Sequence, residues 1–314
     1  MTGNNHPQAL GADAAGIAAA AAALARGEPV ALPTETVYGL AARADSADAV
    51  AAIYRAKGRP DFNPLIVHVP DVARAERLAR FDARARRLAE AFWPGPLTLV
   101  LPLRDDGGIA PAVTAGLATI ALRCPAHPVM RAVLEACGLP LAAPSANRSG
   151  AVSPTTAAHV AHSLAGRIGL VLDGGATAAG IESTIVALRE EGWSLLRPGP
   201  VTEGEIAVLV GPPLPTPAAG QIEAPGQLAS HYAPGKPVRL EATAARADEF
   251  LIGFGPVAGA VNLSPTGDLA EAAARLYACL HQAAAAPQPR VAVAPVPHAG
   301  IGAAINDRLA RAAA

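Results

Sequence analysis

The sequence predicts an α/β protein with a mixed sheet covered by helices in residues 1–210, a linker at 211–237 and a smaller α/β domain at 238–314. Three observations support this organisation. Short apolar runs bounded by Gly, Pro or Asn alternate with helical patterns in the first part. Seven prolines lie between residues 211 and 237, which is the clearest change of composition in the chain. The remaining segment again alternates strand and helix patterns. It has about eighty residues, and domains of this size have modest stability.

The first elements place a polar loop at the end of a strand. An alanine-rich run at 13–27 predicts a helix, and the apolar stretch 29–32 predicts a strand that stops at Pro33. The segment PTETVYG (33–39) therefore begins where that strand ends. A second helix is predicted at 46–57, and the loop KGRP follows its end.

The later elements follow the same alternation. Further strands of the large domain are predicted at 64–70, 96–103, 117–125, 139–147, 169–175, 182–188 and 193–199. Helices between them are predicted at 71–79, 82–92, 127–137 and 155–165. The small domain is predicted to contain strands at 238–242, 249–255, 257–264 and 290–296, and helices at 268–286 and 302–314.

Composition narrows the classes of protein to which the chain can belong. Apolar residues make up 51% and charged residues 16% of the 314 residues, which is typical of a globular protein. No run approaches the roughly eighteen apolar residues that a membrane span needs, so we expect no membrane contact. The apolar run 17–25 has no positively charged segment before it and no cleavage pattern after it. We therefore expect a cytoplasmic protein.

Charge and cysteine usage add two further expectations. The formal net charge of -1 gives no overall field that attracts nucleic acid, so any RNA contact would need a local patch. Cys124, Cys137 and Cys279 are odd in number and widely spaced, which favours reduced thiols over a disulfide framework or a metal site. Lys57 and Lys236 are the only lysines among 25 basic residues. Because ammonium and guanidinium groups are not interchangeable, Lys57 is a candidate functional group.

Several familiar catalytic signatures are missing from the sequence. It contains no P-loop, no HExxH, no GxSxG, and no GxGxxG that opens a helix after a strand. His159 and His162 lie one turn apart in a predicted helix, but no third ligand is evident. We interpret them as a surface or satellite pair.

Polar residues recur where the predicted strands end. They are Thr34, Thr36, Lys57, Arg59, Asn63, His68, Arg123, Ser145, Asn147, Ser153, the run 182–184 and Arg197. Because ligands of α/β sheets gather beyond strand ends, these residues predict one shared pocket. The mixture of cations, hydroxyls and amides suits an anionic ligand such as a polyphosphate.

Each of these features also has a purely structural interpretation. PSANRSG (144–150) has the composition of a turn, and KGRP is as consistent with a helix stop as with a phosphate clamp. Arg123 is as consistent with an ordinary exposed arginine, and His68 with a hydrogen-bonded core histidine. The functional interpretation depends on their joint occurrence.

Seven segments, taken in order, resemble the YrdC-domain family of threonylcarbamoyl-AMP synthases. They are LPTETVYGL (32–40), KGRPDFNPLIVHV (57–69), FWPGPLTLVL (92–101), ALRCP (121–125), APSANRSG (143–150), ESTIV (182–186) and LLRPG (195–199). The family pair K-x-R and S-x-N is met by Lys57 with Arg59 and by Ser145 with Asn147. The resemblance implies a twisted, mixed-sheet YrdC-like fold for the first domain.

The linker and the C-terminal region resemble the long, two-domain type of synthase. This resemblance implies a Rossmann-like second domain and a linker that covers the site as a lid. Family linkers often read SPGMKYRHYAP, whereas this chain reads APGQLASHYAP (224–234). The basic and aromatic residues before His231 are thus absent, but His231 and Tyr232 are present.

The resemblance implies a nucleotidyl transfer from ATP. L-threonine and bicarbonate would form a carbamate whose oxygen attacks the α-phosphorus of ATP, giving threonylcarbamoyl-AMP and pyrophosphate. The product is the precursor of N6-threonylcarbamoyladenosine (t6A) in tRNA and would pass to the downstream t6A transferase machinery. No covalent enzyme intermediate is needed, in agreement with the missing nucleophile motifs. Mg²⁺ would arrive with ATP, and no dedicated protein metal site is expected.

The resemblance also assigns roles to individual residues. Lys57 and Arg59 would be catalytic. Those that would bind ATP are Lys57, Arg59, Asn63, Thr119, Ser145, Asn147, Ser153, Arg197, His231 and Tyr232. Those that would bind L-threonine are Thr34, Thr36, His68, Arg123, Ala143 and Ser183, with Arg123 as a bidentate partner of the carboxylate. Glu35 has no assigned role.

Two other functions remain compatible with the sequence. The same face could bind tRNA or double-stranded RNA by shape without catalysis, although the near-neutral charge disfavours this as the main role. The chain could also act on carbamoyl phosphate, as YrdC-like modules of hydrogenase maturation proteins do. Those proteins carry zinc-finger segments, which three cysteines cannot supply.

Overall fold

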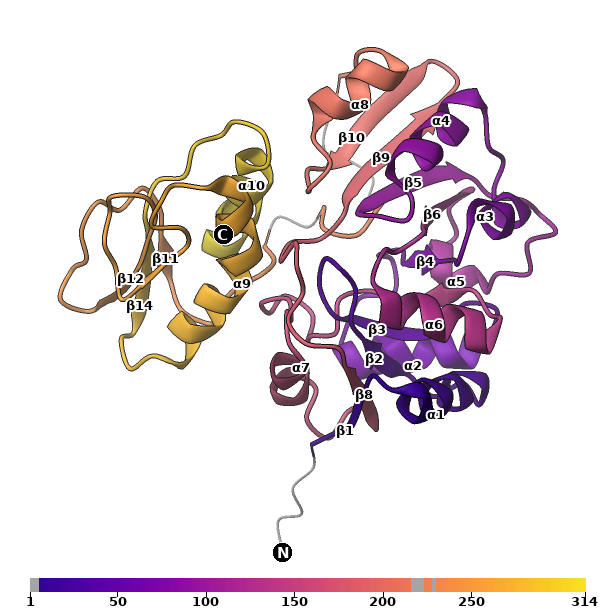
Figure 1. Cartoon of the computed structure of the whole chain (residues 1–314), viewed down its shortest axis with the longest axis horizontal. Helices are drawn as coiled ribbons and strands as arrows, with labels where there is room; N and C mark the ends of the chain where they lie inside the picture. Colours follow the sequence, from indigo (N-terminus) through magenta and orange to yellow (C-terminus); the bar gives the residue numbers. More distant parts are fainter. Residues whose placement is uncertain (1–5, 216–222, 228–229) are drawn as a thin grey trace, which may run out of the picture.

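The computed structural model describes residues 6–215, 223–227 and 230–314, and these form two lobes with one sheet each (Figure 1). The larger sheet has ten strands in the order β1-β8-β2-β3-β7-β4-β6-β5-β9-β10. Those strands are β1 (Gln8–Gly11), β2 (Val30–Leu32), β3 (Gly39–Arg43), β4 (Ile66–His68), β5 (Leu97–Pro102), β6 (Thr119–Arg123), β7 (Leu141–Ala142), β8 (Leu170–Asp173), β9 (Thr184–Arg189) and β10 (Gly192–Arg197). The α/β class with a mixed sheet is confirmed.

Most helices of the larger lobe begin with a side-chain cap, whereas α5 has none. They are α1 (Ala14–Ala25), α2 (Ala47–Lys57), α3 (Val72–Leu78), α4 (Ala83–Phe92), α5 (Pro111–Thr114), α6 (Pro128–Cys137), α7 (Ala157–Ser163) and α8 (Glu203–Val210). Ser46 caps α2 by accepting a hydrogen bond from the backbone N–H of Ala49, and Gly58 ends the helix in the left-handed conformation. This ending turns the chain sharply after Lys57.

Strand directions bring the polar strand ends together. β4 and β6 are parallel, with His68 opposite Arg123 at their carboxyl ends. β5 is antiparallel to β6, and β9 is parallel to β5, so the beginnings of β5 and β9 lie at the same edge. The segment after β7 continues along β4, because the N–H of Ala143 donates to the carbonyl of Ile66. The ends of β4 and β6 and the beginnings of β5 and β9 therefore meet at one edge, whereas β7 is antiparallel to β4 and the segment after it runs back towards the start of β4.

The smaller lobe contains a parallel sheet of four strands in the order β11-β14-β12-β13. Its elements are β11 (Val238–Arg239), β12 (Glu249–Gly253), β13 (Val261–Asn262), α9 (Leu269–Ala285), β14 (Arg290–Val293) and α10 (Gly302–Ala313). Helices α9 and α10 lie between this sheet and the larger lobe (Figure 1). A smaller Rossmann-like α/β domain is therefore confirmed.

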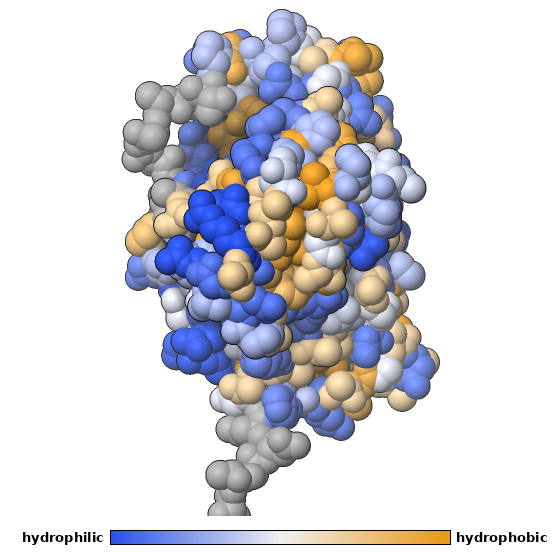
Figure 2. All heavy atoms as spheres, turned by 90° about the vertical axis from the view of Figure 1, so that its left-hand side faces the viewer, coloured by the Kyte–Doolittle hydropathy of each residue, from blue (hydrophilic) through white to orange (hydrophobic). Residues whose placement is uncertain are grey.

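The two faces of the smaller sheet are packed differently. Ile252 and Val293 belong to the core that includes residues of α9 and α10. Leu251 and Ala292, which alternate with them, form a separate small cluster on the opposite face. Figure 2 shows the outward side of this lobe, where apolar surface is interspersed with polar surface.

Some elements were not predicted from the sequence. β1 has an exposed pattern without an apolar run, and β3 contains mostly small residues directly after the polar loop. The short helix α5 and the helix α8 were also missed. In the part of the chain that the structure describes, no helix is long and apolar enough to cross a membrane.

Candidate functional site

A small cavity lies against the large sheet, beside β4, the end of β6 and the segment that follows β7. It is lined by Thr36, Val37, Arg59, Ile66, His68, Arg123, Ala143, Pro144, Ser145, Glu182, Ser183, Arg197, Pro225, Gly226, His231 and Tyr232. The last four residues belong to the linker, so the linker closes one side of the cavity. Only about 40 Å³ of it can hold the centre of a water molecule.

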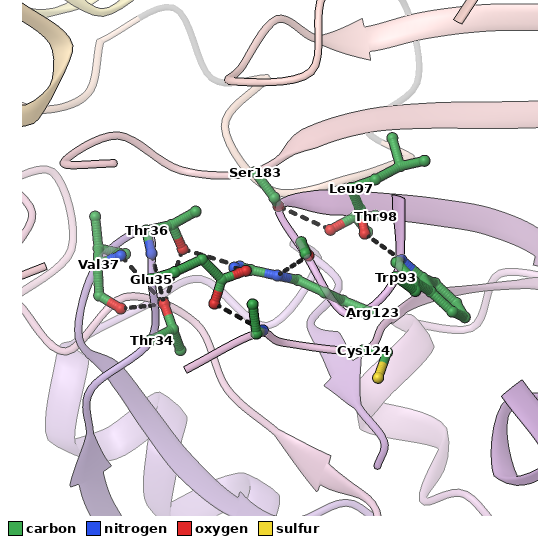
Figure 3. Close-up of polar contacts among 12 residues, drawn as sticks. Thr34, Glu35, Thr36, Val37, Trp93, Leu97, Thr98, Arg123, Cys124 and Ser183 are labelled. Atoms are coloured by element: carbon green, nitrogen blue, oxygen red, sulfur yellow. Dashed lines mark hydrogen bonds and ion pairs between the residues drawn. The ribbon is translucent and has the colours of Figure 1, made fainter. Parts of the chain in front are cut away.

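The loop after β2 carries two threonines whose hydroxyls lie next to each other (Figure 3). The Thr34 hydroxyl donates to the carbonyl of Val37 at 2.6 Å and accepts from the backbone N–H groups of Thr36 and Val37. The hydroxyl oxygens of Thr34 and Thr36 lie 2.8 Å apart. Thr34 therefore holds the turn, whereas Thr36 lines the cavity.

Arg123, at the end of β6, is anchored by this loop. Its Nη1 donates to the Thr36 hydroxyl at 2.9 Å, and its Nη2 donates to Glu35 Oε1 at 2.6 Å (Figure 3). Its Nε donates to the carbonyl of Gly95. Burial raises the pKa of Glu35, but the charge and hydrogen bonds of Arg123, with the backbone N–H of Ala126, bring the pKa below its ordinary value. Glu35 is therefore the anionic partner of Arg123.

His68 and Ser183 complete this half of the cavity. Burial, aided by the positive charge of Arg123, lowers the pKa of His68 to about 3, so its imidazole is neutral near pH 7. The Ser183 hydroxyl lies 2.8 Å from that of Thr98 and accepts from Arg197 Nη2 at 3.1 Å. Both residues line the cavity, as does Ala143.

Lys57 joins the two motifs on which the predicted phosphate site depended. Its ammonium donates to the carbonyls of Ser145 at 2.6 Å and Asn147 at 2.5 Å. Only 3% of its surface is exposed. Burial, together with the positive charge of Arg59, lowers its pKa well below the ordinary value. An ammonium carries three N–H groups, so one remains for a ligand.

The neighbours of Lys57 keep polar atoms without partners. Arg59 donates from Nη2 to the carbonyl of Pro64, while its buried Nε has no partner among the described residues. Burial lowers the pKa of Arg59 to about 10. The Oδ1 atoms of Asn63 and Asn147 are likewise buried without a partner in the described part of the chain.

Glu182 links the cavity to the smaller lobe. Its Oε1 accepts from the Ser153 hydroxyl at 2.6 Å, and its Oε2 accepts from the hydroxyl of Tyr277 and from Arg308 Nε. Burial raises the pKa of Glu182, but the nearby positive charges and these hydrogen bonds bring it down to about 2. Tyr277 and Arg308 lie 95 and 126 residues further along the chain, and no local motif marks them.

The linker places His231 and Tyr232 against the cavity. The N–H of His231 donates to the carbonyl of Arg311, and Tyr232 has a positive φ of 64°. Burial lowers the pKa of His231 to about 3. A Cβ added at Gly226 would lie 2.9 Å from the Arg197 side chain, so glycine allows the linker to pass closely.

Two residues occupy places that the sequence interpretation did not give them. Thr119 starts β6, four residues from Arg123, and is not among the residues that line the cavity. Four residues of strand span roughly 13 Å, so Thr119 lies away from the site. His159 does not form a surface pair with His162, because it stacks on His281 of α9 with ring centroids 3.8 Å apart. It belongs to the contact between the two lobes.

Residues 22–199 match a family model named Sua5_yciO_yrdC and described as "Telomere recombination". Residues 201–314 match a second model, described as "Threonylcarbamoyl-AMP synthase, C-terminal domain". The chain belongs to the Sua5/YciO/YrdC family. The first model covers every cavity-lining residue of the larger lobe, and the second covers those of the linker.

Relatives in this family carry the same name in distant organisms. The chain is 49% identical over 229 residues to the threonylcarbamoyl-AMP synthase of Bacillus subtilis, a match that covers 71% of this chain and 66% of the relative. It is 45% identical over 221 residues to that of Pyrococcus abyssi, with 68% and 64% covered. The matches therefore span just under two thirds of these relatives. A putative synthase of Mycobacterium tuberculosis is 39% identical, with 62% of this chain and 89% of the relative covered.

Solved structures of the family extend the likeness to nearly the whole chain. A structure of Pyrococcus abyssi Sua5 complexed with L-threonine aligns with a TM-score of 0.87 and 36% identity, covering 95% of this chain and 94% of the other. A variant of the same protein, with a histidine and a tyrosine replaced by alanine, aligns with a TM-score of 0.89 and 33% identity, covering 98% and 96%. Both lobes of this chain are thus typical of the Sua5 branch of the family.

Proposed function

We propose that the chain synthesises L-threonylcarbamoyl-AMP from L-threonine, bicarbonate and ATP and releases pyrophosphate. The main support is a cluster of unsatisfied polar atoms. Eight buried side-chain polar atoms lack a hydrogen-bond partner among the described residues, and five of them belong to Arg59, Asn63, His68, Asn147 and His231. Arg59, His68 and His231 all line the cavity. Because buried polar groups are normally hydrogen-bonded, their unpartnered atoms indicate a polar ligand.

The two halves of the cavity suit the two larger substrates. An arginine has five N–H donors, and the described contacts of Arg123 use three of them. One N–H on each Nη thus remains to bind the carboxylate of L-threonine, with Thr36, His68 and Ser183 close by. Arg59 and the buried Arg197 line the other half of the cavity, and Lys57 is buried against the carbonyls of Ser145 and Asn147. These three cations would hold the phosphates of ATP.

In the proposed reaction the protein positions reactants and neutralises charge. The amine of threonine and bicarbonate form a carbamate, a carbamate oxygen attacks the α-phosphorus, and pyrophosphate leaves with its electron pair. Lys57 and Arg59 would stabilise the negative charge on the phosphates as the bond to the leaving group breaks. Holding the carbamate in a closed cavity would also keep it from water.

Magnesium would be carried by the nucleotide rather than by a protein cage. Within the described ranges, no group of three or more His, Cys, Asp or Glu side chains could hold a metal ion. Glu182 lines the cavity and Glu35 pairs with the cavity-lining Arg123, and both carboxylates already accept hydrogen bonds from arginine. These residues fit Mg²⁺ bound mainly to phosphate oxygens and water, where it would neutralise phosphate charge.

The closed cavity implies that the linker moves to admit ATP. Ligand pockets for molecules of this size commonly have volumes of about 300–1,000 Å³. The cavity offers far less while Pro225, Gly226, His231 and Tyr232 line it. We propose that this linker segment withdraws to admit ATP and closes over it afterwards.

The decisive experiment measures pyrophosphate release from ATP and Mg²⁺ with threonine and bicarbonate each omitted in turn. We expect release only with both present, and mass spectrometry of the product should give threonylcarbamoyl-AMP. Release that continues without threonine, or that requires carbamoyl phosphate in place of bicarbonate, would show that the chain carries out a different reaction.

A further inference from the structure

The Glu182 carboxylate lies at the cavity, but two of the three residues that donate to it in the described part of the chain come from the other lobe. Tyr277, on α9, donates its hydroxyl to Oε2 at 2.7 Å, and Arg308, on α10, donates its Nε to the same oxygen at 3.0 Å. Neither side chain is exposed to solvent. The smaller lobe therefore determines how a carboxylate of the larger lobe is oriented.

The same two residues also contact the linker. The Arg308 guanidinium lies 5.5 Å from the centroid of the Tyr232 ring, within the range of a cation–π interaction. The Tyr277 ring stacks on the Tyr232 ring with centroids 5.5 Å apart. Tyr277 and Arg308 thus hold Glu182 and the cavity-lining Tyr232 at the same time.

The orientation of Glu182 matters because of the cations around it. Its negative charge is close enough to raise the pKa values of both Lys57 and Arg197, against the lowering effect of burial. Within the described residues, however, neither cation forms a hydrogen bond to it: Lys57 donates to the carbonyls of Ser145 and Asn147, and Arg197 to Ser183 and the carbonyl of Pro225. A direct pair with either cation would neutralise charge needed for phosphates.

We propose that Tyr277 and Arg308 are positioning residues that the smaller lobe contributes to the nucleotide half of the site. By binding the Glu182 carboxylate themselves, they keep it from pairing with Lys57 or Arg197, which remain available to the phosphates of ATP. This proposal rests on the proposed function for the identity of the nucleotide. It makes the smaller lobe a functional part of the site.

The first test compares ligand affinities rather than activity alone. Tyr277→Phe removes one hydroxyl and keeps the ring, so the fold should persist. We expect the dissociation constant of a non-hydrolysable ATP analogue with Mg²⁺, measured by calorimetry, to rise about tenfold, as the loss of a hydrogen bond to a charged group predicts. The KM for threonine should stay within about twofold, because Arg123 and Thr36 lie outside this network. An unchanged nucleotide affinity would refute the proposal.

The second test asks whether the Glu182 carboxylate, once it lacks a partner from the smaller lobe, causes the loss of nucleotide affinity. Arg308→Met removes the charged partner of Glu182 and leaves the hydrogen bonds from Ser153 and Tyr277, and it should weaken binding of the ATP analogue more than Tyr277→Phe does. Adding Glu182→Gln removes the competing negative charge itself. We expect the double variant to regain most of the nucleotide affinity. If the double variant binds the ATP analogue as weakly as Arg308→Met does, Arg308 serves only to hold the two lobes together.

A matched control addresses general destabilisation of the smaller lobe. Glu249→Gln weakens the buried ion pair with Arg239, which contacts neither Glu182 nor the linker. We expect normal nucleotide affinity in this variant, and an equal loss in it would refute the proposal. Because binding of the analogue needs no turnover, these results stand even if the wild-type chain shows no release of pyrophosphate that depends on threonine and bicarbonate. In that case only the proposed function fails.

Discussion

At the scale of single residues, the two lysines of the chain have the same type of environment. Lys57 donates to two main-chain carbonyls of the loop after β7, and Lys236 donates to the carbonyls of Ala283 and Ala286 at the end of α9. A compact ammonium can donate to converging carbonyls in this way, whereas a planar guanidinium donates along a fixed fork. In a chain with 25 basic residues and only two lysines, this accounts for lysine at both positions.

Lys57 therefore offers a sharp test at this scale. Lys57→Ala should lower threonine- and bicarbonate-dependent pyrophosphate release at least about tenfold, because a charged hydrogen-bond donor is lost from the reacting phosphates. Lys57→Arg should not restore it, since the longer fork does not fit between the carbonyls. Lys236→Arg, which alters the same kind of contact away from the cavity, should retain activity. A fully active Lys57→Arg would show that only charge matters at this position.

Sequence reasoning at this scale succeeded where a residue lies in a compact motif. Arg59, Asn147 and Arg123 were identified because each follows an apolar run or a helix end. In the structure Arg59 and Arg123 line the cavity, and the carbonyl of Asn147 binds Lys57. Tyr277 and Arg308 were missed because their partner is Glu182, far away along the chain. Nothing local to α9 or α10 distinguishes these two side chains from ordinary core residues.

At the scale of elements, the loop after β2 is fixed to the end of β6 by one ion pair. The distance from Arg123 Nη2 to Glu35 Oε1 is 2.6 Å, and the two side chains are only 4% and 15% exposed. A second bond from the backbone N–H of Ala126 holds the other Glu35 oxygen. The charge of Arg123 is therefore compensated before any substrate binds.

Removal of Glu35 should destabilise the protein in a way that threonine can repair. Glu35→Ala leaves a nearly buried guanidinium unpaired, and breaking such a pair costs about 3 kcal/mol. The carboxylate of threonine would then supply the missing negative charge. We expect a lower Tm by differential scanning fluorimetry and a larger rise in Tm on adding threonine than in the wild type. Serine and valine serve as ligand controls, and an equal threonine response in both proteins would contradict this role of Arg123.

Elements were predictable where apolar periodicity or capping residues mark them, and less so elsewhere. Ser46 and Gly58 delimit α2 as expected, since the cap and the left-handed glycine are local signals. β1 has mostly exposed residues, and β3 joins the sheet through pairs with β2 and β7 that the sequence does not reveal. Non-local pairing determined these strands, so local patterns could not predict them.

At the scale of the whole molecule, the two lobes are joined by polar contacts as well as by the linker. His159 of α7 stacks on His281 of α9, and His281 Nε2 lies 3.0 Å from the carbonyl of Ser153. The spacing of His159 and His162 suggested a local pair, but the ring that His159 contacts belongs to the other lobe. The contact between lobes could not be predicted from either lobe alone.

This contact predicts that acid weakens the protein before its carboxylates are protonated. Burial, with the charge of His281, lowers the pKa of folded His159 to about 4, and burial lowers those of His68 and His231 to about 3. Unfolded histidine has a pKa near 6.5. The stability that these neutral histidines provide is complete above about pH 6.5 and is lost as the pH falls towards 4. Glu182 has a folded pKa of about 2, so the stability that its charge provides is lost only below about pH 4.5.

We therefore expect the midpoint of urea unfolding to fall between pH 7.5 and pH 5, a range in which Glu182 stays ionised. His159→Asn should reduce this dependence, because one group that takes up a proton on unfolding is gone. His298→Asn, at an exposed position of the smaller lobe, should leave it unchanged. Equal slopes in His159→Asn and the wild type would show that the stack between the lobes does not contribute to acid sensitivity. Limited proteolysis at the same pH values would then show whether the lobes separate before either unfolds.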